Sequence, residues 1–212
     1  MIIFTLLSGA ALAGSADGID HELSIETGSM RTSDDTWSAF SYSDSVGAWG
    51  LRAGYGLSRN LTVVASWHRG VHDSSLGVDG ESYHNLDMDF TTNQIALGPK
   101  VDYQIDHWLR PYGTVQGMGV LGRIQIDEDR DDDDSPVLSY SDTTFGGFAA
   151  LGLDIVPGAA THRAHFGMHI ELGYGKVFGM EFEDEEAGNA AIAIGDLDMQ
   201  GLTFNAGAGV RF

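Results

Sequence analysis

Several kinds of residue are absent or scarce in this sequence, and each shortage removes a class of protein. The chain of 212 residues has no cysteine, which excludes a disulfide framework, a thiolate metal site and a cysteine nucleophile. Lysine and arginine number 11 against 31 acidic residues, and a formal charge of −20 argues against a nucleic-acid partner. After the N-terminus no run reaches the ~18 apolar residues of a membrane-spanning helix. We therefore expect neither a nucleic-acid-binding protein nor a helical membrane protein.

The first 13 residues, MIIFTLLSGAALA, are predicted to be a cleaved signal peptide. An apolar run is followed by small residues at the expected cleavage positions, although no lysine or arginine precedes the run. The alternatives are a longer N-terminal region upstream of the given start, or a buried first strand. The rest of the chain, residues 14–212, has the length of one domain.

Apolar and polar residues alternate with a period of two through most of residues 14–212, and no stretch has a helical period. The last strand is the clearest example, because Leu202, Phe204, Ala206, Ala208, Val210 and Phe212 share one face. Similar patterns begin near Leu23, Trp49, Leu61, Gln94, Thr143 and His162. Between Leu109 and Ile126 the alternation breaks near Gln116, which predicts a β-bulge there.

The connections between these strands alternate between short and long. The short ones are expected at residues 58–60, 106–108 and 157–161, and the long ones at residues 31–45, 72–87, 127–141 and 180–196. Acidic residues concentrate in the third and fourth long connections, and aromatic residues gather at both ends of the strands. This pattern predicts an all-β fold, an eight-stranded antiparallel transmembrane β-barrel with up-and-down meander order. A soluble exported β-protein is the alternative, and it would be recovered without detergent.

The chain resembles the small outer-membrane β-barrel superfamily, the group that contains the OmpA transmembrane domain and OmpX. The resemblance rests on the C-terminal strand and on two hairpin-like segments, AGYGLSRNLTVVASW (residues 53–67) and VDYQIDHWLRPYGTVQGMGV (residues 101–120). It implies location in the outer membrane of a Gram-negative bacterium. It also implies that Phe204, Val210 and Phe212 form a membrane-insertion signal for the barrel-assembly machinery.

If the apolar faces meet lipid, the opposite faces place many charged residues in the lumen. Charges removed from water must be paired or hydrogen-bonded, and an eight-stranded barrel is narrow enough for side chains to fill. We expect a lumen charge network; a proton- or ion-conducting path is the alternative. The expected members are Glu22, Glu26, Arg52, Lys100, Asp102, Arg163, His169, Glu171 and Arg211, with His68, Asp154 and His165 on the same faces.

Three other clusters have weaker chemical interpretations. His165 and His169 stand ~13 Å apart on a strand, too far to share one ion. The segment DEDRDDDDSP (residues 127–136) lacks the glycine and glutamate of an EF-hand, so it predicts a solvated loop with, at most, weak Ca²⁺ or Mg²⁺ binding. His72, Asp73, Ser74 and Ser75 contain the groups of a hydrolase, but no catalytic motif accompanies them.

The sequence thus predicts a monomeric barrel with long acidic loops outside the cell, no enzymatic activity and no cofactor or metal. The expected function is a structural or surface-interaction role; the alternative is a narrow channel or transporter for ions or a small apolar solute. Expected partners are outer-membrane lipid, lipopolysaccharide and the barrel-assembly machinery, with divalent cations at the acidic loops.

Overall fold

A computed structural model describes residues 20–31, 45–78, 84–106, 108–128, 138–157, 164–181 and 196–212. Within these ranges it contains eight strands: β1 (Glu22–Arg31), β2 (Ser45–Ser58), β3 (Leu61–Val78), β4 (His84–Asp102), β5 (Leu109–Glu128), β6 (Leu138–Ile155), β7 (His165–Glu181) and β8 (Asp196–Arg211). The same ranges include no helix of the length and apolarity that crossing a membrane requires. The predicted signal peptide lies outside them and stays a prediction.

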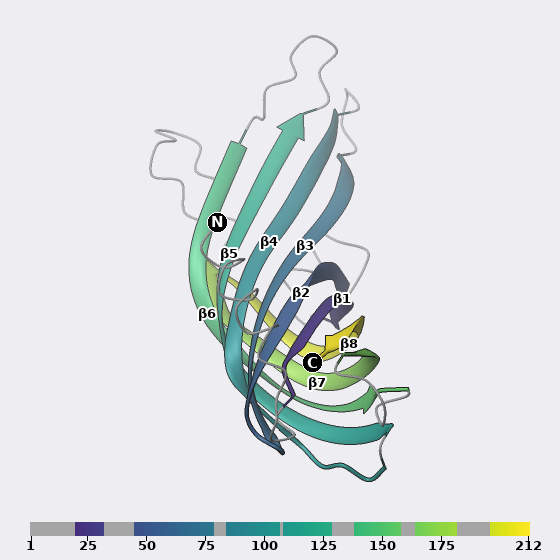
Figure 1. Cartoon of the computed structure of the whole chain (residues 1–212). Helices are drawn as coiled ribbons and strands as arrows, with labels where there is room; N and C mark the ends of the chain where they lie inside the picture. Colours follow the sequence, from purple (N-terminus) through teal and green to yellow (C-terminus); the bar gives the residue numbers. More distant parts are fainter. Residues whose placement is uncertain are drawn as a thin grey trace, which may run out of the picture.

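The strands form a closed antiparallel barrel in which each strand pairs with its neighbours in the chain (Figure 1). Closure comes from the ladder between β1 and β8, which runs from Glu22–Arg211 to Met30–Thr203. Two backbone hydrogen bonds between His21 and Phe212, of 2.8 and 3.0 Å, continue this ladder beyond the strands. The predicted eight-stranded meander is therefore confirmed.

Glycine allows the first and last strands to approach closely. A Cβ atom on Gly209 would lie 2.0 Å from the backbone oxygen of Leu23 and 2.6 Å from the Cα of Ser24. No side chain fits at that distance, so this position requires a residue without a Cβ.

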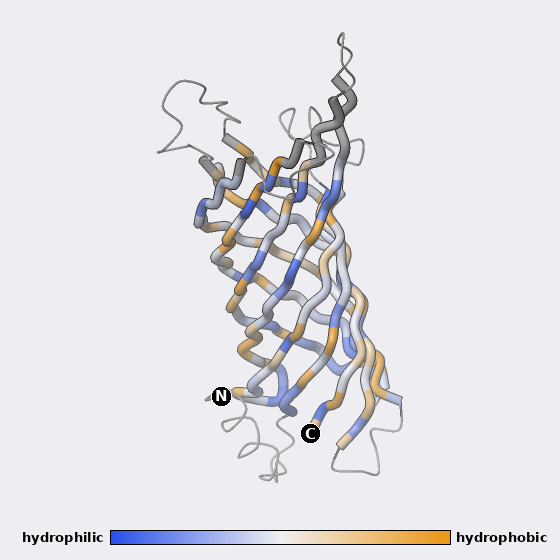
Figure 2. The backbone as a smooth tube through the Cα atoms, turned by 90° about the horizontal axis from the view of Figure 1, so that it is seen from above, coloured by the Kyte–Doolittle hydropathy of each residue, from blue (hydrophilic) through white to orange (hydrophobic). Residues whose placement is uncertain are grey.

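Buried and exposed residues alternate along the strands, which places successive side chains in the lumen and on the outer wall. The colours in Figure 2 show hydrophilic and hydrophobic residues interspersed along the same strands. In β5 the even-numbered residues from Tyr112 to Ile124 are buried, and the β5–β6 register has no shift between Leu109 and Ile126. The predicted bulge near Gln116 is therefore wrong. The register shifts lie elsewhere, between Gly56 and Ser58 in the β2–β3 ladder and between Val177 and Met180 in the β7–β8 ladder.

The outer wall is apolar, as expected for a lipid-facing surface. Large exposed apolar residues line it on every strand, including Ile95 at 67% and Leu151 at 75% exposure. Aromatic residues lie at both ends of this apolar zone: Trp49, Phe145 and Phe178 are exposed toward the long connections, and Tyr55, Tyr103 and Trp108 toward the short ones. Trp49 and Trp67 contact edge to face, with ring centroids 5.3 Å apart. Two such belts are typical of membrane-spanning barrels.

Strands β3 to β6 extend farther than the other four and form a taller side of the barrel (Figure 1). The predicted second long connection, residues 72–87, is therefore wrong in its bounds, because β3 continues to Val78 and β4 begins at His84. The third is also shorter than predicted, because β5 reaches Glu128 and β6 begins at Leu138. These strand extensions have a polar sequence because their outward side chains lie beyond the apolar zone of the wall. Asp73, Asp89, Arg123 and Ser141 are all exposed.

Candidate functional site

The inner faces of the eight strands bring together most of the predicted lumen residues near the short-turn end of the barrel. Arg52 on β2 lies at the centre of this lumen charge network. Its Nε is 3.2 Å from Glu22 Oε1, and its Nη1 is 3.2 Å from Glu171 Oε2 and 3.8 Å from Glu26 Oε2. The Arg52 and Glu171 side chains are only 2% and 1% exposed. The guanidinium thus balances carboxylates from β1 and β7.

Lys100 and Arg211 form a second centre in the same network. Lys100 Nζ is 2.7 Å from Glu22 Oε2 and 2.8 Å from Asp154 Oδ2, and it lies 4.4 Å from the Tyr112 ring centroid. Arg211 Nη2 is 2.9 Å from the same Glu22 oxygen and also pairs with Asp154. Glu22 therefore joins the two centres, because it contacts Arg52, Lys100 and Arg211.

Glu26 lies between two histidines, on the side of this network nearer the long connections. Its Oε1 is 2.7 Å from His68 Nε2, and its Oε2 is 3.1 Å from His169 Nε2. Tyr112 and Asn205 complete the set by donating hydrogen bonds to Glu171, at 3.1 and 3.0 Å.

The two remaining predicted members of the lumen charge network are Asp102 and Arg163. Asp102 is buried on the inner face of β4, near its end, and Arg163 lies outside the described residues. Within the ranges that the structure describes, no three His, Asp or Glu side chains are arranged to hold a metal ion.

The half of the lumen nearer the long connections is apolar, which the sequence analysis did not predict. Thirteen buried residues form a single cluster there: Met30, Val46, Met88, Phe90, Ala96, Met118, Val120, Ile124, Tyr140, Val177, Met180, Leu197 and Met199. Phe90, Val120, Met180 and Met199 have no exposed surface. The sequence of β5 contained evidence for this cluster. Met118, Val120 and Ile124 are apolar and lie on the same face of the strand as Gln116.

The charged and apolar halves meet at a small cavity of about 50 Å³. Polar side chains including His68, Gln94 and Asn205 line one part of it, and Met30, Met118 and Met199 line another. Such a volume accommodates a water molecule or two. Side chains thus fill the lumen on both sides of this cavity.

The three hydrolase-type groups whose side chains the structure describes do not share one face of the barrel. His72, Asp73 and Ser74 lie on β3, whose alternation places Asp73 on the outer face and the other two on the inner face. The acidic segments at residues 129–137 and 182–195 fall outside the described residues, so cation binding there stays a prediction.

A closed antiparallel barrel with an apolar outer wall and a charged lumen defines the class of transmembrane β-barrels. Residues 2–212 match the family described as outer membrane protein beta-barrel domain, and the chain belongs to this family. The protein is therefore an outer-membrane protein, as the resemblance implied. A search of curated proteins finds no match.

Solved structures of small outer-membrane barrels are similar in fold. Ail, the attachment invasion locus protein of Yersinia pestis, is 16% identical with a TM-score of 0.51, over 92% of this chain and 99% of Ail. Ail in complex with the heparin analogue sucrose octasulfate gives 17% and 0.52 over the same shares. Neisserial surface protein A is 15% identical with a TM-score of 0.44, over 93% of this chain and 97% of that chain. At these identities the similarity shows the fold alone.

Proposed function

We propose that this protein is a non-conducting outer-membrane barrel that presents a protruding sheet and acidic connections for interactions at the cell surface, without catalysis. The observation that carries the proposal is the unequal height of the barrel. The β2–β3 ladder ends at Gly47–Val71, although β3 continues to Val78. The β6–β7 ladder begins at Gly146, although β6 begins at Leu138.

Beyond these two points, the described part of β3 to β6 is joined only by the ladders among those four strands. The β3–β4 ladder reaches Val78–His84, and the β5–β6 ladder reaches Ile126–Leu138. A four-stranded sheet therefore rises on one side of the barrel, with β3 and β6 at its edges. Edge strands are common sites for adding an extended segment of a partner, which supports a role in surface interactions.

The filling of the lumen supports this proposal over the alternative of a channel. Ions would have to separate the buried pairs around Arg52 and then pass the apolar cluster around Phe90. Breaking one buried pair typically costs about 3–5 kcal/mol. We therefore expect the lumen to act as a structural core, with the C-terminal strand serving in membrane insertion and the barrel remaining a monomer.

The test compares the full protein with a variant whose protruding sheet is shortened. Residues 73–89 and residues 125–139 are each replaced by Asn-Gly, which joins His72 to Phe90 and Ile124 to Tyr140, positions already paired across their hairpins. Adhesion of bacteria carrying each form to epithelial monolayers and to plates coated with serum proteins is measured. Boiled and unboiled gel mobility verifies that both barrels fold.

We expect adhesion by the full protein, loss of adhesion in the shortened variant, and no steady conductance in planar bilayers for the full protein. Equal adhesion of the two folded forms would contradict the surface-interaction role. Stable conductance steps from the full protein would instead favour the channel.

A further inference from the structure

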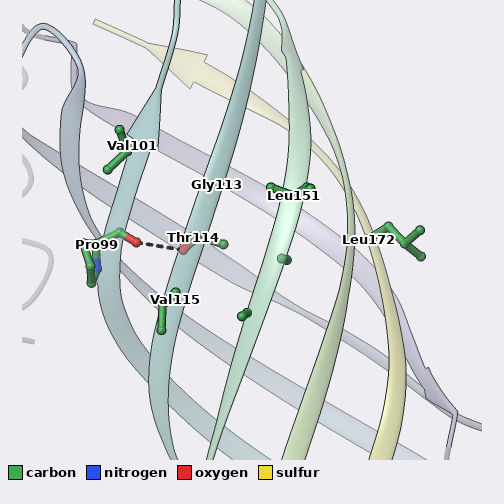
Figure 3. Close-up of a pocket in the computed structure, with 9 residues that line it drawn as sticks. Pro99, Val101, Gly113, Thr114, Val115, Leu151 and Leu172 are labelled. Carbon is green, nitrogen blue, oxygen red and sulfur yellow. Dashed lines mark hydrogen bonds between the residues drawn. The ribbon is translucent and has the colours of Figure 1, made fainter.

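An open apolar groove lies on the outer wall, with a volume of about 490 Å³ (Figure 3). It crosses β4, β5, β6 and β7, and its rims are formed by apolar side chains that point away from the barrel, among them Val101, Leu151 and Leu172. The groove arises where outward positions hold small residues, Gly113 on β5 and Ala149 on β6. The backbone is left without covering side chains between the larger residues on either side.

The floor of the groove has little capacity for further polar contacts. Pro99 lacks an N–H, and the β4–β5 ladder passes from Leu97–Gly117 to Lys100–Thr114 across it. The Thr114 hydroxyl compensates by donating a hydrogen bond of 3.0 Å to the Pro99 carbonyl oxygen, drawn dashed in Figure 3. The Thr114 side chain itself faces the lumen, where its hydroxyl also accepts a hydrogen bond from Gln116. The outward side chains that line the groove are apolar, so the site suits an occupant without hydrogen-bonding groups.

The surroundings of the groove indicate which part of the membrane reaches it. Val101 precedes the exposed Tyr103, and Gly113 follows the exposed Trp108, so both lining residues lie close in sequence to the short turn between β4 and β5. Short turns lie on the periplasmic side of outer-membrane barrels, so this end faces the periplasm, and the aromatic residues there mark the interface with the lipid headgroups. A lipid whose polar head lies at that belt can place its tail along Val101 and Gly113.

We propose that the groove between β4 and β7 binds one acyl chain of a phospholipid from the periplasmic leaflet. A second copy of the barrel fits this shape less well, because a barrel wall is much broader than the groove and would rest on its rims at Leu151 and Leu172 without filling it. An acyl chain is linear and apolar, and in the groove its methylene groups gain van der Waals contacts with a closely packed wall that they lack in the looser bilayer. This inference does not depend on the proposed surface interaction.

The experiment uses the full protein in nanodiscs of phosphatidylethanolamine, released into the gas phase for native mass spectrometry. Gly113→Leu fills the groove; a Cβ at this position would meet Leu151 Cδ2 at 3.6 Å, an ordinary contact. Gly117→Leu is the matched control, because it lies on the same face of the same strand, does not line the groove, and its Cβ would meet no atom within 4 Å. Gel mobility before and after boiling verifies the folding of each variant.

We expect the wild type and Gly117→Leu to retain one lipid adduct, and Gly113→Leu to lose it. Nanodiscs of phosphatidylglycerol with the same acyl chains should give the same retention, because the tail is recognised rather than the head. Equal lipid retention by wild type and Gly113→Leu overturns the proposal, and so does a loss of retention when only the headgroup is changed. A wild-type dimer that Gly113→Leu abolishes, with no lipid on the monomer, would assign the groove to a second copy.

Discussion

Replacing Arg52 by methionine should destabilise the barrel strongly, because Arg52 balances three carboxylates in the lumen. The substitution keeps an unbranched, flexible apolar stem and removes the guanidinium with its charge. Glu171 would then have no cation within 4.0 Å among the described residues, although the hydrogen bonds from Tyr112 and Asn205 would remain. Removing one partner of a buried ion pair costs about 3–5 kcal/mol, and we expect a loss of unfolding free energy in this range.

The assay is equilibrium urea unfolding of the protein in lipid vesicles, followed by tryptophan fluorescence. Arg123→Met is the matched control, because Arg123 is exposed on the outer face and donates a long hydrogen bond of 3.4 Å to Ser139. We expect it to change the unfolding free energy by less than about 0.5 kcal/mol. Adding Glu171→Gln to Arg52→Met should restore part of the loss, since the uncompensated carboxylate is then removed.

A loss below about 1 kcal/mol for Arg52→Met would refute this reasoning, because that is the range of exposed ion pairs. It would mean that water or bound ions replace the guanidinium without difficulty. Full additivity of the two substitutions would separately show that Arg52 and Glu171 do not interact in the folded barrel.

Three further predictions concern the wall and the lumen. Thr114→Val should lower the unfolding free energy by about 1 kcal/mol in the same urea assay, because the Pro99 carbonyl loses its donor; an unchanged midpoint would contradict this. Gly209→Ala should destabilise the closure of β1 on β8 by about 1–3 kcal/mol and weaken the folded band in unboiled gels, whereas Gly117→Ala should leave that band intact. Met118→Leu should cost less than about 1.5 kcal/mol because it nearly conserves volume in the apolar cluster, and a larger loss would show that the cluster is packed more specifically than we infer.

The fold was predictable because a lipid environment imposes a simple rule on each strand. Outward residues such as Leu151 and Leu172 must be apolar, so the alternation and the spacing of turns already define eight strands. The membership of the lumen network follows from the same parity. Its pairing does not, because it depends on the register around the whole barrel: Arg52 meets Glu171 across 119 residues of sequence.

Two of the errors share a physical origin, the expectation that the inner face is polar and the outer face apolar along the full length of each strand. Where Met118 and Val120 follow Gln116 on that face, the change to apolar residues was taken for a bulge. Where Asp73 and Asp89 occupy outward positions, strands that continue above the lipid were taken for loops. The outer groove was also missed, since the sequence shows Gly113 and Ala149 as small residues but not the rims around them.

Along the barrel axis, an apolar wall around a charged lumen gives way to a polar wall around an apolar lumen. This change fixes how deeply the protein sits in the membrane. Lowering it would carry Asp73, Asp89 and Arg123 into hydrocarbon, at about 2–4 kcal/mol for an arginine at the midplane. Raising it would expose the Ile95 and Leu151 wall to water. The part of the barrel around Phe90 is built like a water-soluble protein, with an apolar interior and a charged exterior. It can therefore keep its shape in water where the bilayer is thin or fluctuates. One continuous sheet thus fixes the depth at which the barrel sits in the membrane.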